Sequence, residues 1–85
     1  MTLSAYEEEV VQMFKKAAWE VDQKTFEDLN IEDKISALGI DSVAMLEVIG
    51  YFEEEYDIHL PDEKLSRVET VRDLAELIEQ TRPSA

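Results

Sequence analysis

The sequence is poor in the residues that cross-link a chain or interrupt its regular structure. Its 85 residues include no cysteine and only two glycines and two prolines. The lack of cysteine excludes a disulfide framework and thiolate metal sites, and it favours a reducing compartment. The scarcity of glycine and proline argues against a linker or a fibrous protein. We therefore expect one folded domain over residues 1–85, with frayed ends at about 1–3 and 82–85.

Targeting and membrane signals are also missing. The opening stretch "MTLSAYEEEV" lacks the basic region and the apolar run of a signal peptide. No apolar run approaches the roughly 20 residues needed to span a bilayer. We expect a soluble, cytoplasmic protein.

Positive charge is scarce. Lys and Arg total 8 against 21 Asp and Glu, which gives a net charge of −13. Such a surface repels nucleic acid and anionic lipid, so we expect neither as a partner. It attracts proteins with basic patches and disfavours self-association, so a monomer is expected. The alternative is that the acidity only keeps the domain soluble.

Local start signals predict four helices. "SAYE", at residues 4–7, and "TVRD", at 70–73, each fit a capping box. Asp41 suits the N-cap of a helix that starts at Ser42, and Pro61 suits the first turn of a short helix. The helices are expected at residues 5–20, at 42–56, within "PDEKLS" at 61–66, and from 71 to an end marked by Arg82 and Pro83.

The segment 22–41 is long for a connection and too apolar for a free linker. We expect an ordered loop that is pinned across the core, and its length signals either a functional role or a short helical turn inside it. No strand pattern of useful length appears. The predicted fold is all-α: an antiparallel four-helix bundle with three main helices, a short third helix and a long ordered loop between helices one and two.

The predicted helix at 42–56 has two distinct faces. Its core face is an apolar stripe at helical spacing: Met45, Val48, Ile49, Phe52 and Tyr56. The opposite face is then turned towards solvent: Val43, Leu46, Glu47, Gly50 and Glu54.

Ser42 is the candidate site residue, and three roles compete for it. A nucleophile needs a base within reach, yet the one histidine, His59, lies beyond the far end of the helix, and no G-x-S-x-G elbow is present. A helix-capping role is already filled by Asp41. An attachment point remains, because a phosphate ester there would face free backbone N–H groups and the positive end of the helix dipole.

Metal binding has little support. "DLNIED" resembles the start of a calcium loop, but the required glycine is Asp33 and the required glutamate is Gly39. The acidic residues 53–55, with Asp57, Asp62 and Glu63, are interpreted as a solvated face. We expect no dedicated metal site, although a weak divalent site on that face stays open.

The stretches "LGIDSV", "LEVIGYFEEEYDIHLPDE" and "TVRDLAELI" resemble the acyl carrier protein family. The resemblance implies a non-catalytic carrier whose Asp-Ser motif is Asp41 and Ser42. Ser42 would carry 4′-phosphopantetheine, attached from coenzyme A by a phosphopantetheinyl transferase. The thiol of that group would hold an acyl or aminoacyl intermediate as a thioester for partner enzymes.

The resemblance also implies contact surfaces. Val43 stands where the family usually has leucine, and Glu47 and Glu54 fall where it has acidic residues. The implied partners are the transferase and an acyltransferase, ligase or ketosynthase with basic patches. Residues expected to bind partners are Val43, Leu46, Glu47, Gly50, Glu54, Asp62 and Glu63. Residues expected to line the interior that admits an acyl chain are Met45, Ile49, Phe52 and Tyr56.

Departures from the family pattern indicate a subtype. The segment "SVAMLEVIGYF" is less acidic than expected of a fatty-acid-synthesis carrier. Gly50 costs roughly 0.5–1 kcal/mol relative to alanine inside a helix, and it either leaves a notch for a partner side chain or is a tolerated replacement. We expect a free-standing carrier of polyketide-type biosynthesis. The alternatives are a peptidyl carrier of nonribosomal peptide assembly and an acidic interaction module without a prosthetic group.

Overall fold

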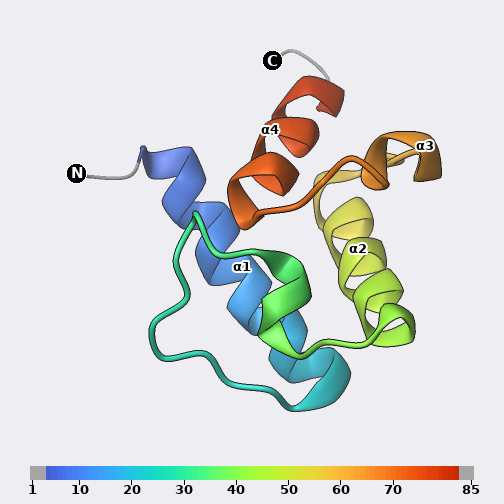
Figure 1. Cartoon of the computed structure of the whole chain (residues 1–85). Helices are drawn as coiled ribbons and strands as arrows, with labels where there is room; N and C mark the ends of the chain where they lie inside the picture. Colours follow the sequence, from blue (N-terminus) through green and yellow to red (C-terminus); the bar gives the residue numbers. More distant parts are fainter. Residues whose placement is uncertain (1–3, 83–85) are drawn as a thin grey trace.

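The structure, a computed structural model, describes residues 4–82 and is all-helical there. Helix α1 spans Ala5–Asp22, α2 Ser42–Tyr56, α3 Asp62–Leu65 and α4 Val71–Thr81, and a 3-10 helix, η1, spans Ile35–Leu38. The α1 helix runs in the opposite sense to α2 and α4 and packs against both (Figure 1). The predicted helical bundle is confirmed. Of the ends expected to fray, 1–3 and 82–85, the structure describes Arg82 alone, which is the C-cap of α4. The expected end signal at Pro83 lies outside the described residues.

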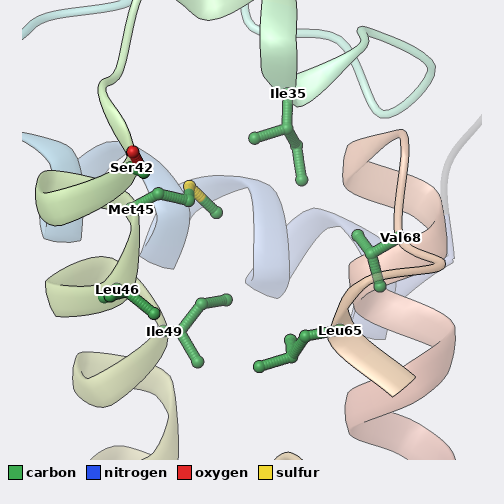
Figure 2. A pocket seen from close by; sticks show the side chains of 7 residues that line it. All are labelled: Ile35, Ser42, Met45, Leu46, Ile49, Leu65 and Val68. Carbon is green, nitrogen blue, oxygen red and sulfur yellow. The ribbon is translucent and has the colours of Figure 1, made fainter. Parts of the chain in front are cut away.

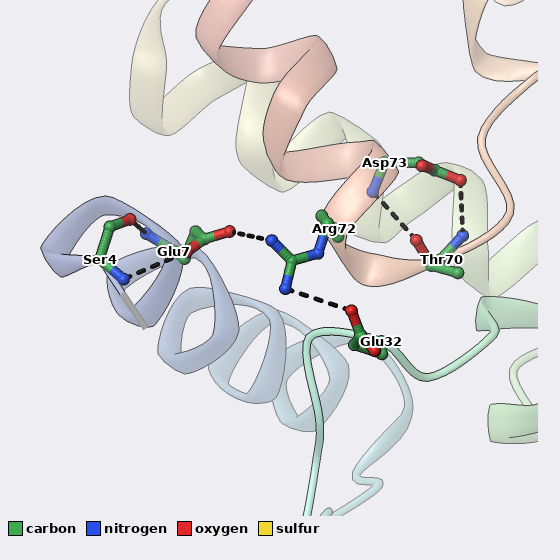
Figure 3. A network of polar contacts seen from close by, with 6 residues as sticks. All are labelled: Ser4, Glu7, Glu32, Thr70, Arg72 and Asp73. Atoms are coloured by element: carbon green, nitrogen blue, oxygen red, sulfur yellow. Dashed lines mark hydrogen bonds and ion pairs between the residues drawn. The ribbon is translucent and has the colours of Figure 1, made fainter. Parts of the chain in front are cut away.

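Side-chain caps fix where the helices begin. Ser4 accepts from the backbone N–H of Glu7, whose carboxylate accepts from Ser4 N–H, and Thr70 and Asp73 repeat this arrangement at α4 (Figure 3). Both predicted capping boxes are therefore confirmed. The prediction for Pro61 was one position off, because Pro61 is the N-cap of α3 and the helix proper begins at Asp62.

The core lies where α1, α2 and α4 meet. Phe14 of α1 and Phe52 of α2 are fully buried, with ring centroids 6.3 Å apart. Leu74 and Ile78 of α4 are also fully buried. Burying a side chain of this size stabilises the fold by about 1.5–3 kcal/mol. This shared core fixes the direction of α2 and thus the position of its first residue.

The loop between α1 and α2 is ordered, as predicted, and it is held against the start of α4. The backbone N–H of Arg72 donates to the carbonyl of Ile31 at 2.7 Å, and Ile35 N–H donates to the carbonyl of Glu69 at 2.8 Å. Ile31 is buried in the core. A single antiparallel bridge between Lys34 and Thr70 is the one strand-like pairing within residues 4–82. The loop therefore reaches Ser42 from a fixed position.

Between residues 4 and 82, no helix combines the length and the apolar character that crossing a membrane requires.

Candidate functional site

Ser42 is the first residue of α2, and its hydroxyl is exposed. Asp41 is the N-cap, and its Oδ1 accepts from the backbone N–H of Ala44 at 2.8 Å. The Asp41 carbonyl accepts from Met45 N–H, also at 2.8 Å. No side chain or carbonyl within residues 4–82 hydrogen-bonds to the Ser42 hydroxyl. The predicted N-cap is confirmed: Asp41 caps the helix, and the Ser42 hydroxyl is not used for capping.

An apolar cleft opens beside Ser42, between α2 and the segment that runs from α3 to α4. Its volume is about 310 Å³. Figure 2 shows Met45 and Ile49 pointing from α2 across the cleft, with Leu65 and Val68 on the opposite wall and Ile35 at one end. Ser42 is the single residue with a polar side chain among the seven that line it. The complete lining is Ile35, Ser42, Met45, Leu46, Ile49, Leu65 and Val68.

A second cavity, of about 490 Å³, also reaches Ser42. It shares part of its wall with the apolar cleft, through Ile35, Ser42, Met45 and Val68. Its remaining wall is mostly polar and consists of Lys34, Ser36, Ile40 and Glu69. Ser42 therefore lies at the junction of one apolar and one partly polar cavity.

The four residues expected to line an interior that admits an acyl chain fall into two pairs in the structure, of which one lines the cleft. Met45 and Ile49 reach the apolar cleft. Phe52 is fully buried in the helix core, and its ring stacks on that of Tyr56 with centroids 6.3 Å apart. Tyr56 lies three turns from Met45, under the guanidinium of Arg82. Phe52 and Tyr56 thus pack the interior without lining the cleft beside Ser42.

The outer face of α2 is exposed, as its spacing predicts. Val43 and Leu46 are 70% and 64% exposed, although both are large and apolar. Glu47 and Glu54 are exposed on the same helix. A Cβ added to Gly50 would meet no atom within 4 Å. Asp62 and Glu63, the first two residues of α3, are also exposed. This surface combines two apolar side chains with several carboxylates.

Glu53 has a different environment from Glu54. Its Oε2 accepts from the backbone N–H of Leu60 at 2.7 Å and lies 3.2 Å from Nδ1 of His59. Glu53 therefore holds the turn between α2 and α3. His59 is 87% exposed and lies beyond the far end of α2, about 22 Å of helix away from Ser42. A Ser-His nucleophile pair is thus ruled out by geometry.

The weak divalent site left open on the acidic face is not supported. Across the described part of the chain, no three Asp, Glu or His side chains gather closely enough to hold a metal ion.

Seven cavity residues were not among the predicted site residues: Lys34, Ile35, Ser36, Ile40, Leu65, Val68 and Glu69. Leu65 and Val68 form an apolar i, i+3 pair, which was a usable signal. Lys34 carries no local signal, because it approaches Ser42 only through the folded loop.

Comparison with known proteins identifies the class. A family model described as "Phosphopantetheine attachment site" matches residues 20–78. The chloroplastic acyl carrier protein SF2 of Brassica campestris is 43% identical over 49 residues, which are 58% of this chain and 37% of that protein. The match thus spans little more than a third of the relative's length. The chain belongs to the acyl carrier protein family, whose members are carriers with a 4′-phosphopantetheine prosthetic group and are not enzymes.

Solved structures agree with this fold. An acyl carrier protein from Thermotoga maritima aligns over 94% of both chains with a TM-score of 0.83, at 24% identity. The acetyl actinorhodin acyl carrier protein from Streptomyces coelicolor aligns over 93% of this chain and 90% of its own, with a TM-score of 0.65, at 25% identity.

Proposed function

We propose that Ser42 is the attachment residue for 4′-phosphopantetheine and that the protein presents an attached acyl group to partner enzymes. The observation that carries this proposal is the exposed, unbonded Ser42 hydroxyl at the start of α2, beside an apolar cleft. Bound there, the prosthetic group supplies a thiol that holds the acyl group as a thioester.

The start of α2 suits a phosphodiester. The backbone N–H groups of Ser42 and Val43 come before the first intrahelical hydrogen bond, so they stay available to an anion. The positive end of the helix dipole favours negative charge at the same place. Asp41 already satisfies the N–H of Ala44, so Ser42 can be modified without loss of the cap.

The apolar cleft suits the cargo. Met45 and Ile49 line one wall and Leu65 the other. An alkyl chain placed between these walls would be removed from contact with water. Burial of each methylene is worth about 0.8 kcal/mol. Phe52 and Tyr56 do not line this cleft, so we assign chain contact to Met45 and Ile49 and a packing role in the interior to Phe52 and Tyr56.

The outer face of α2 and the start of α3 suit partner docking. Proposed partners are a phosphopantetheinyl transferase and an acyltransferase, ligase or ketosynthase with basic patches. Val43, Leu46 and Gly50 offer apolar contact. Glu47, Glu54, Asp62 and Glu63 add charges that steer encounter. The protein is proposed to act as a monomer.

Polyketide-type biosynthesis is our proposal for the pathway. Two features support it: the weakly acidic first half of α2 and the structural likeness to the actinorhodin carrier. A peptidyl carrier is the second candidate, but "GIDS" lacks the Gly-Gly pair typical of that class. We propose a cytoplasmic location on the absence of cysteine, although the Brassica relative is described as chloroplastic.

One experiment tests the proposal. The folded protein is incubated with coenzyme A and a broad phosphopantetheinyl transferase, and its intact mass is measured. We expect a gain of one phosphopantetheine group, lost in Ser42→Ala. Ser66→Ala is the matched control, because Ser66 is an exposed serine that lines neither of the cavities at Ser42. If the wild-type protein gains no mass, an acidic interaction module becomes the better description.

A further inference from the structure

The two cavities that meet at Ser42 differ in the chemistry of the walls they do not share. The unshared wall of the apolar cleft is Leu46, Ile49 and Leu65. The unshared wall of the other cavity, which we call the polar branch, is Lys34, Ser36, Ile40 and Glu69. A group attached to Ser42 therefore has access to two environments, and its chemistry decides which it enters.

Lys34 is the one cationic residue that lines either cavity. No carboxylate within residues 4–82 forms an ion pair with it, even though the chain holds 21 acidic residues. Arg72 at the start of α4 is already engaged, because it pairs with Glu7 and Glu32. Lys34 is thus an uncommitted charge beside the candidate attachment residue.

The backbone of Lys34 is fixed. Its carbonyl accepts from Ala37 N–H at 2.9 Å, and it forms the bridge to Thr70. The next residue, Ile35, donates to Glu69 O at 2.8 Å. The loop is therefore tied at Lys34 and Ile35 to the two residues that precede α4. The Lys34 ammonium moves only within the reach of its own side chain.

We propose that Lys34 is a positioning residue for the prosthetic group: it holds the anionic phosphodiester and draws the adjoining polar portion into the polar branch. The inference rests on the proposed attachment at Ser42. A phosphodiester and amide groups lose hydration in an apolar cleft without compensation. In the polar branch the Lys34 ammonium can donate to the phosphodiester, while the Ser36 hydroxyl and the Glu69 carboxylate can accept from the amide N–H groups farther along. A charge-assisted contact is also stronger than a neutral one.

The two cavities then hold different parts of the attached group. When the polar portion is held by Lys34, the apolar cleft stays free for an alkyl chain. A cargo without an alkyl chain has no apolar surface to bury in the cleft, so it is not drawn there. The cleft and the polar branch together then distinguish apolar from polar cargo on the same serine.

Backbone-amide NMR spectra of the unmodified, phosphopantetheinylated and hexanoyl-loaded full chain test this inference. Without cargo, we expect the modification to shift the amides of Ser36 and Glu69 more than those of Ile49 and Leu65. Hexanoyl loading should then shift Ile49 and Leu65. Lys34→Gln should at least halve the Ser36 and Glu69 shift changes, and Lys34→Arg should restore them. Lys64→Gln is the control, because it removes the same charge from a cavity that does not include Ser42.

The outcomes separate this inference from the proposed function. If intact mass shows no phosphopantetheine on the wild-type protein, the proposed function itself fails. If the modification is present but the shifts fall on Ile49 and Leu65, or if Lys34→Gln and Lys64→Gln behave alike, the role of Lys34 is overturned while the attachment stands. The peak dispersion of each spectrum shows whether the variant is folded. If Lys34→Gln is not folded, Lys34→Arg carries the test.

Discussion

Arg72 of α4 donates to Glu7 of α1 at 2.7 Å, although the two residues are 65 positions apart. The second terminal nitrogen of the guanidinium, Nη2, lies 3.3 Å from Oε1 of Glu32 in the long loop (Figure 3). Ser4 N–H, together with the charge of Arg72, lowers the pKa of Glu7. One side chain therefore joins two helices and the loop that leads to Ser42.

The first prediction concerns this junction. Arg72→Gln should lower the urea midpoint of unfolding and speed amide hydrogen exchange in the loop, because Glu7 and Glu32 lose their shared partner. Arg67→Gln is the charge-matched control, since Arg67 forms no ion pair within residues 4–82. Equal loop exchange in the two variants would contradict the assigned role. A small loss of stability is expected in both variants, because each adds to the net negative charge.

The second prediction concerns Asp73, whose pKa is lowered by backbone N–H donation from Glu69 and Thr70. A lowered pKa in the folded state means that the stabilisation is complete above the ordinary carboxyl pKa of about 4 and is lost as pH falls through the lower, folded value. Asp73→Ala should cost about 1 kcal/mol near neutral pH, as expected for a lost cap. The cost should shrink in acid.

Urea unfolding at neutral and acidic pH measures this difference. Glu76→Ala is the control, because it removes the same charge from an exposed position of α4 outside the capping box. A destabilisation of Asp73→Ala that is the same at both pH values would show that its carboxylate is not what stabilises the helix start.

The third prediction compares two tyrosines that share Arg82. The guanidinium carbon lies 5.3 Å from the ring centroid of Tyr6 and 4.8 Å from that of Tyr56. The Tyr6 hydroxyl donates to Ala75 O at 3.2 Å, whereas the buried Tyr56 hydroxyl has no partner within residues 4–82. Tyr6→Phe should therefore cost about 1 kcal/mol, while Tyr56→Phe should be neutral or stabilising.

Alkaline titration gives a second readout. Burial raises the pKa of Tyr56 to about 12. A raised pKa means that the stabilisation from the neutral phenol is fully present below the ordinary value of about 10 and is lost as pH rises through the folded value. Phenolate absorbance should show a late ionising step that disappears in Tyr56→Phe. If the late step persists in that variant, it belongs to another tyrosine.

The fourth prediction concerns the acidic outer face of α2. Glu47→Lys with Glu54→Lys should lower the association rate with the phosphopantetheinyl transferase and weaken its salt dependence, while dissociation changes less. Stopped-flow binding at low and high salt measures both rates. Glu20→Lys with Glu76→Lys is the control, because it makes the same change in net charge on α1 and α4. Equal effects in the two double variants would assign the steering to net charge alone.

Local signals explain why the helix starts were predictable and the cavity was not. Ser4, Asp41 and Thr70 each cap through a residue three positions away, so the sequence contains the whole contact. The cleft beside Ser42 instead joins α2 to residues near 35 and 65–68, which meet only after the loop docks on α4. Tyr56 shares the apolar stripe of Met45, yet about 16 Å of helix separates them. A stripe predicts a buried face but not which part of that face borders a cavity.

The last prediction concerns Gly50, the one glycine within a described helix. An added Cβ meets no atom within 4 Å, so Gly50→Ala should fold normally and gain about 0.5–1 kcal/mol of stability from helix propensity. A natural residue that lowers stability without a steric reason suggests a contact outside the chain. Gly50→Met should therefore match Gly50→Ala in helicity yet weaken binding to one partner selectively. Circular dichroism measures helicity, and titration against each partner measures affinity. If every partner binds Gly50→Met as it binds the wild type, Gly50 is a tolerated replacement and the docking surface on α2 is formed by Val43 and Leu46.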